Sequence, residues 1–236
     1  MDRKLIPNME WPGAFGNSSL LEEMAATLLE TSGKGLRTFD HDLFNRKPRR
    51  VKVLFAFSDW HGDLNDIIDN VNISTNDLTA LSERAELPAR ELWARYRLLV
   101  RATVSELYRV KEVTEPFFKD LKRLGVMDAS DRRACSQLIR GLLENLIKVR
   151  NQITHKSMPV LEEERRAMLT VMAEIAGGVF VLNGTVVALC PAAEVGEIAA
   201  KFGSELHEMG EGLFDLLQRM SEAMATHIVE GDGWEN

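Results

Sequence analysis

Residues 51–71 read VKVLFAFSDWHGDLNDIIDNV, and this stretch decides which fold class the chain adopts. It opens with a run of apolar residues that would suit a buried strand, but its longer pattern is helical. The apolar residues recur at steps of three and four, at Val53, Phe57, Trp60, Leu64, Ile67, Ile68 and Val71. That spacing places them on one helix face, with the aspartates of the stretch away from it, toward solvent. The stretch therefore predicts an amphipathic helix.

A strand followed by Asp-x-His is the alternative interpretation of the same residues. It resembles the opening motif of metallophosphoesterases, in which Asp59 and His61 would bind a metal ion. Such enzymes need further Gly-Asp, Gly-Asn-His and Gly-His segments after later strands, and no such segment follows in this sequence. This alternative predicts a strand directly before Asp59, and the helical periodicity argues against it.

The N-terminal part of the chain shows an arm followed by helix signals. Residues 1–16 contain two prolines and two glycines and predict an extended arm. Asn17, Ser18 and Ser19 predict the N-terminal cap of a helix that ends near Gly33. A basic, turn-rich linker is expected over residues 37–50. Ser74, with an acid three residues later, predicts the start of a further helix.

The second half of the chain repeats these helix signals, with prolines and glycines marking the boundaries. Helices are expected over residues 88–113, 116–125, 128–158, 162–176 and 192–228. The break before the second of these helices is placed at Pro116, because proline lacks the backbone N–H group that a helix interior uses. The last helix contains several glycines, which we expect to allow close packing.

Residues 179–189, VFVLNGTVVAL, can be interpreted in two ways. Asn-Gly between two β-branched runs is a hairpin signal. The apolar period and length also allow a buried helix, and we expect the helix because a lone hairpin has no evident sheet to join. The sequence as a whole therefore predicts an all-α helical bundle.

Charge is distributed unevenly along the 236 residues, whose net charge is -7. Residues 1–83 carry -4, residues 84–156 carry +7 and residues 157–236 carry -10. A positive middle third could attract a phosphate backbone that the rest of the molecule repels. A solvated helix face produces the same imbalance, so the charge alone does not decide between these interpretations.

The sequence shows no pattern typical of a signal peptide, a membrane span or a metal site. Its N-terminus has no signal-peptide apolar run, and its most apolar stretch is shorter than a membrane span. Cys135 and Cys190 show no metal-ligand or redox spacing and are interpreted as reduced core cysteines. We expect a cytoplasmic protein that does not bind membranes, metals or cofactors.

The stretch KVRNQITHK, residues 148–156, carries the candidate site. In a helix, side chains four residues apart overlie each other, so Asn151 and His155 share a face, Lys148 and Glu144 extend this row toward the N-terminus, and Arg150 lies at its border. The long guanidinium of Arg150 can reach the same groove. The pattern predicts a polar edge beside the packing seam of the helix.

This arrangement resembles the HEPN family, which is marked by Arg, a polar residue, a short spacer and His near the end of a long helix. Arg150, Asn151 and His155 match the motif, and the resemblance covers about residues 88–230. It implies a HEPN-like helical domain over 88–230, with residues 1–87 as an additional helical extension of unassigned role. It also implies a metal-independent endoribonuclease that acts as a homodimer, with a role as a toxin or phage-defence effector and an antitoxin or another regulatory partner.

The chemistry of RNA cleavage suits these residue types. Histidine can transfer protons near neutral pH, and arginine can hold phosphate oxygens with its planar guanidinium. We expect Lys148, Lys156 and Arg140 to contact the RNA. Some toxin members of the family have a tyrosine two residues after the histidine, and Ser157 stands at that position.

A non-catalytic helical interaction or ligand-binding module is the alternative function. Arginine and histidine near the end of a helix also satisfy its last carbonyl groups and interact favourably with its dipole. In that case Arg150 and His155 would stabilise the helix, and the protein would cleave no RNA.

Overall fold

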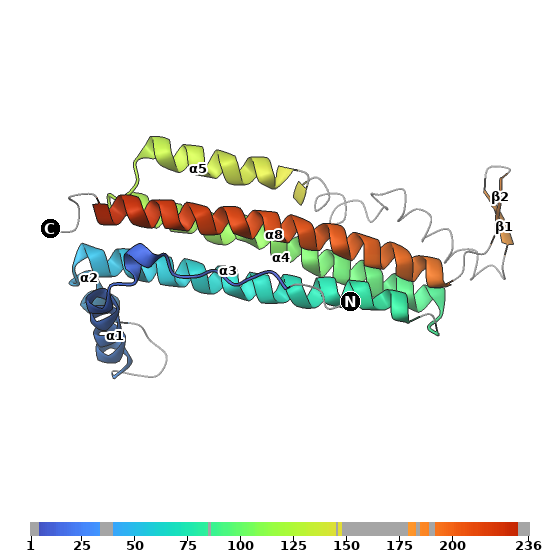
Figure 1. The fold of residues 1–236 in the computed structure, drawn as a ribbon, viewed down its shortest axis with the longest axis horizontal. Helices are drawn as coiled ribbons and strands as arrows, with labels where there is room; N and C mark the ends of the chain where they lie inside the picture. Colours follow the sequence, from blue (N-terminus) through green and yellow to red (C-terminus); the bar gives the residue numbers. More distant parts are fainter. Residues whose placement is uncertain are drawn as a thin grey trace. The chain divides into compact units, whose positions relative to one another are not determined.

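The computed structural model describes residues 5–33, 40–84, 86–144, 146–147, 179–182, 185–188 and 192–230. Most of these residues are helical, which confirms the predicted all-α class (Figure 1). The helices in chain order are η1 (Gly13–Phe15), α1 (Ser18–Ser32), α2 (His41–Asn45), α3 (Arg49–Ala80), η2 (Leu81–Glu83), α4 (Ala89–Arg123), α5 (Ala129–Leu142) and α8 (Ala192–Glu230). None of the described helices is both long and apolar enough to cross a membrane.

The helix expected over residues 179–189 is wrong, because the structure has a β-hairpin there. Strand β1 (Val179–Leu182) pairs antiparallel with β2 (Thr185–Ala188), with Val179 opposite Ala188 and Leu182 opposite Thr185. Asn-Gly turn chemistry and β-branched residues therefore outweigh the apolar length of the stretch. The two strands form a sheet by themselves.

Two predicted helix breaks are also wrong. Helix α3 continues through Ser74, whose hydroxyl donates to the carbonyl of Asn70 at 2.8 Å and so does not cap a new helix. Helix α4 continues through Pro116 to Arg123. Proline removes one helix hydrogen bond, and burial of Phe117 and Phe118 directly after it favours the continuous helix.

The chain forms two compact units. The first unit contains residues 1–7, 67–110 and 142–212, and the second contains residues 8–66, 111–141 and 213–236. Helices α3, α4 and α8 are each divided between the units, with one part of the helix in the first unit and the other part in the second. Both units therefore use residues from either side of the predicted boundary at residues 87/88, and that boundary stays a prediction.

Glycines spaced seven residues apart let α8 approach α3 closely in the first unit. A Cβ atom added at Gly196 would lie 2.8 Å from the carbonyl oxygen of Leu81, and one added at Gly203 would lie 2.9 Å from the Cβ of Leu78. Both distances are shorter than normal van der Waals contact. The close packing expected for the glycines of the last helix is confirmed.

Buried hydroxyl groups add polar contacts between the helices of the first unit. Thr75 of α3 lies 3.2 Å from Nδ1 of His207 on α8, and Thr103 of α4 donates to Ser74 of α3 at 2.8 Å. All four side chains are buried. Because buried polar groups are costly when unpaired, these contacts favour one register of α3 against its neighbours.

Aromatic side chains fill the core of the second unit. Trp60 of α3 stacks on Phe117 of α4 at a centroid distance of 4.2 Å, and its indole N–H donates to the Thr114 hydroxyl at 3.1 Å. Phe57 lies edge-on to Phe117 at 4.9 Å. The first part of the apolar stripe in residues 51–71, which includes Phe57 and Trp60, therefore faces this core, as its spacing predicts.

Candidate nucleic-acid interface

Most of the predicted site lies outside the described residues. This holds for the catalytic candidates Arg150, Asn151 and His155, and also for Lys148 and Lys156. Their predicted roles stay predictions.

Arg140 is the predicted RNA-binding residue that the structure describes. It is exposed on α5, and its Nη2 lies 3.4 Å from Oε1 of Glu115 on α4. An exposed ion pair of this length is weak in water. Arg140 therefore stays available to a phosphate, although Glu115 partly offsets its charge.

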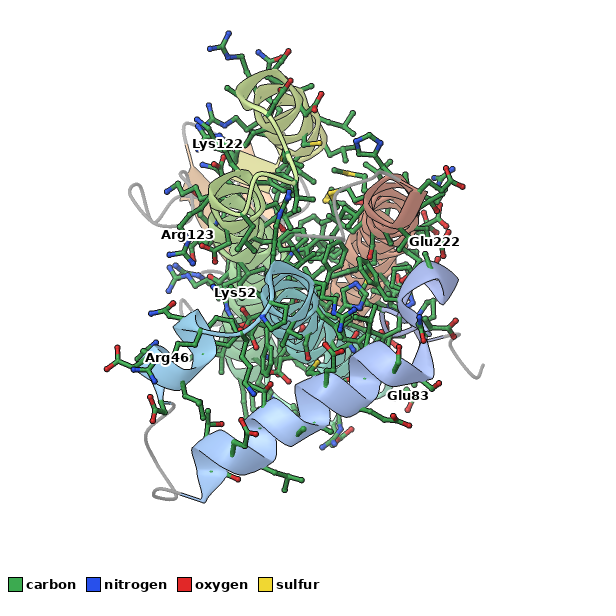
Figure 2. The ribbon with its side chains drawn as sticks, turned by 90° about the vertical axis from the view of Figure 1, so that its left-hand side faces the viewer. Arg46, Lys52, Glu83, Lys122, Arg123 and Glu222 are labelled. Atoms are coloured by element: carbon green, nitrogen blue, oxygen red, sulfur yellow. The ribbon has the colours of Figure 1, made fainter. Side chains whose placement is uncertain are left out.

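The second unit gathers other cations into what we call the basic patch: Arg46, Arg49, Lys52, Lys122 and Arg123. Figure 2 shows the labelled members Arg46, Lys52, Lys122 and Arg123 along one side of the view, with Glu222 of the same unit on the other. These cations come from the end of α2, the first turn of α3 and the last turn of α4.

Hydrogen bonds to backbone carbonyls hold the basic patch together. The guanidinium of Arg49 donates to the carbonyl of Gly125 at 2.6 Å, and the N–H of Gly125 donates to the carbonyl of Lys122 at 3.0 Å. Gly125 has a φ of 70°, which glycine adopts without strain at the end of a helix. Lys52 donates to the carbonyl of Asn45 at 2.7 Å, next to Arg46.

Much of the positive charge in the basic patch is not neutralised. Arg46 and Lys122 are exposed and form no ion pair with any described residue. Arg123 pairs with Asp120 at 3.2 Å, but both side chains are largely exposed, so water screens the pair. Since lysine and arginine bind phosphate oxygens, the patch has the chemistry of a nucleic-acid contact.

Two neighbouring cations of the same unit, Lys47 and Arg50, form ion pairs and are therefore not included in the basic patch. Nζ of Lys47 lies 2.6 Å from a carboxylate oxygen of Glu30, and the guanidinium of Arg50 forms a bidentate ion pair with Glu23. Helix α1 supplies both carboxylates. These two cations therefore contribute less to the local positive field than Arg46 and Lys122.

The sequence did not reveal this patch. The basic runs at residues 46–52 and 119–123 are visible, but the first lies mostly in the linker expected over residues 37–50, and the second lies in the helix expected over residues 116–125 with no role assigned to its charges. The hydrogen bond from Arg49 to the turn after α4 joins the two runs in the folded protein. The two runs of positive charge can be seen in the sequence, but their proximity in the folded protein cannot.

The metallophosphoesterase alternative is wrong, because it requires a strand directly before Asp59, whereas Asp59, His61 and the ten residues before Asp59 all lie in helix α3. His61 is buried, with Nε2 2.8 Å from the hydroxyl of Ser221 on α8. Burial lowers the pKa of His61 to about 4. Partial burial, and then the charges of Asp63 and Asp120, raise the pKa of Asp59.

A mainly apolar pocket of about 360 Å³ also lies in the second unit. Its lining residues come from the end of α4, the following turn, α5 and the end of α8: Leu121, Val126, Met127, Asp131, Ala134, Cys135, Ala223, Met224, His227 and Ile228. Burial, and then the charge of Asp131, raise the pKa of the Cys135 thiol. Because the thiolate is the reactive form, this pocket is suited to binding an apolar group rather than to thiol catalysis.

Comparisons with known proteins returned no relative. No family model matches the chain, and neither a curated protein nor a solved structure matches it.

Proposed function

We propose that this protein is a metal-independent endoribonuclease of the HEPN type that acts as a homodimer. The observation that carries the proposal is the motif of Arg150, Asn151 and His155 in a chain whose described residues are mostly helical. The basic patch of the second unit supports it, because RNA must be held by its phosphates while it is cut.

The three residues have separate roles in the proposed reaction. His155 takes the proton of the 2′-hydroxyl group or returns one to the leaving 5′-oxygen. Arg150 stabilises the negative charge of the phosphorane, and Asn151 orients the phosphate or the imidazole by hydrogen bonds. One motif has only one histidine, so a two-fold dimer would supply a second for the remaining proton transfer.

The test is cleavage of a labelled single-stranded RNA by the full-length protein in EDTA. We expect the wild type to cut, and His155→Ala and Arg150→Ala each to lower the rate at least tenfold, because each removes a reacting or charge-stabilising group. His41→Ala and Arg219→Ala are matched controls, since both residues are exposed and lie outside the motif. Undiminished cleavage in both motif variants would sink the proposal.

The basic patch makes a separate prediction about RNA binding. In Arg46→Ala/Lys122→Ala, RNA affinity should fall, and the slope of log K against log salt should become less negative by about 1 to 2, because two phosphate contacts are lost. Filter binding at several salt concentrations measures this slope. Lys47→Ala is the matched control, because Glu30 already neutralises Lys47. A slope equal to that of the wild type would contradict the role of the patch.

A non-catalytic, ligand-binding helical module is the second candidate function. The apolar pocket of the second unit favours it, since its volume suits a small molecule. This candidate predicts no RNA cleavage by the wild type and a loss of stability in His155→Ala. The same cleavage assay, together with thermal melts of the variants, separates the two candidates.

The biological role belongs to the same proposal. An endoribonuclease without a metal requirement could serve as a toxin or phage-defence effector, and such an enzyme would need an antitoxin or another regulatory partner. Action in the cytoplasm agrees with cellular RNA as the substrate.

A further inference from the structure

The N-terminal arm is held through its backbone by side-chain carboxamides. In the second unit, Asn65 of α3 accepts from the N–H of Met9 at 2.6 Å and donates to its carbonyl at 3.4 Å. Gln218 of α8 makes the same two contacts with Glu10, at 2.9 and 3.1 Å. Because these four hydrogen bonds end on backbone atoms, they do not depend on the side chains of the arm.

The two carboxamides hold consecutive residues from different helices. In an extended chain, the polar groups of successive residues point in opposite directions. Since α3 binds Met9 and α8 binds Glu10, the two helices clamp the backbone from both sides. Asn72 repeats this device in the first unit, with contacts of 2.9 and 3.1 Å to the backbone of Ile6.

Apolar side chains of the arm pack at the clamped residue Met9 and at two positions after the clamps, Trp11 and Phe15. Met9 and Phe15 are buried, and the ring of Phe15 lies 4.6 Å from that of Phe57. Trp11 is 39% exposed and lies 5.2 Å from the imidazole of His61. Backbone clamps combined with side-chain pockets are the means by which proteins recognise extended peptides.

One buried polar atom of this surface, Nδ1 of His61, does not form a hydrogen bond with the described residues of the arm. Nε2 of His61 pairs with Ser221, but its Nδ1 has no hydrogen-bond partner in the described part of the chain. The ring is 3% exposed and is surrounded by Trp11, Phe57 and Trp60. Leaving a buried polar atom unpaired destabilises the folded protein. A different occupant could provide the missing polar contact.

We propose that the surface formed by Phe57, His61, Asn65 and Gln218 is a peptide-binding groove, which residues 8–16 occupy in cis. Its ligand is a segment of a partner protein that is non-helical at the clamped residues and, like the arm, has apolar residues at the spacing of Met9, Trp11 and Phe15, the last of which lies in the short helix η1. The arm competes at the high effective concentration of a tethered ligand. The arm thus controls access of the partner to the groove.

The experiment uses the full-length protein and a fluorescein-labelled peptide of residues 8–16, NMEWPGAFG, with binding measured by fluorescence anisotropy. Phe15→Ala removes an anchor of the tethered arm, so this variant should bind the peptide at least tenfold more tightly than the wild type. Adding Gln218→Ala should weaken that binding at least fivefold, because half of the clamp is lost. Gln137→Ala, on the exposed side of α5, is the matched control and should change nothing.

Circular dichroism checks that each variant is folded. If Phe15→Ala does not fold, Trp11→Ala replaces it, since that side chain is partly exposed. Equal binding to the wild type and the arm variant, or binding that survives Gln218→Ala, would overturn the proposal. A wild-type dimer that is lost in the arm variant would assign the groove to the arm of a second copy and would also overturn it.

Discussion

Gly196→Ala is expected to destabilise the protein by about 2 kcal/mol, although alanine is the better helix former. The added Cβ would lie 2.8 Å from both the carbonyl oxygen of Leu81 and the Cα of Ser82. Both atoms belong to the backbone, so no side chain can rotate away, and α8 must move from the end of α3. Urea unfolding of the variant and the wild type measures the difference in the free energy of unfolding.

Two other glycines of α8 provide graded controls. An added Cβ at Gly212 has no neighbour within 4 Å, so Gly212→Ala should stabilise the protein by about 0.5 to 1 kcal/mol. At Gly210 the nearest atom is Cδ1 of Ile6 at 2.7 Å, the end of a flexible side chain, and the effect should be intermediate. Equal stability of the Gly196 and Gly212 variants would show that α8 does not pack closely against α3.

The second large effect is expected from His61 as the pH is lowered. The unfolded chain protonates this histidine below its ordinary pKa of 6.5, whereas the folded protein does so only near pH 4. Between these values the unfolded state binds more protons, so stability is complete above pH 6.5 and falls as the pH approaches 4. The loss amounts to about 3 kcal/mol over this window.

The double variant His61→Phe/Ser221→Ala tests this linkage, because it removes the imidazole together with the hydroxyl that would otherwise lose its partner. Urea unfolding at pH 7.5 and 4.5 should show a smaller drop in stability for this variant than for the wild type, by about 2 to 3 kcal/mol. Ser221→Ala alone keeps the titrating ring and should retain the full drop. An unchanged pH dependence in the double variant would mean that His61 is not the group responsible.

Local sequence patterns were sufficient for the helical class. The stripe of residues 51–71 predicted α3, and the glycines of the last helix predicted close packing, both of which the structure confirms. Prediction failed where two local signals competed. At Ser74 and Pro116, burial on a continuous helix outweighs the local break, and at residues 179–188 turn chemistry outweighs apolar length. The ribonuclease motif at residues 150–155 lies outside the described residues and stays a prediction.

By itself, the sequence determined the helical class and the apolar face of a long helix such as α3, because periodicity is a property of neighbours along the chain. Only the tertiary structure decided which distant polar groups meet. It places Arg49 beside the turn at Gly125, and it brings Asn65 and Gln218 to the same arm. These groups lie many residues apart, and no local pattern encodes their pairing, which follows from how whole helices pack.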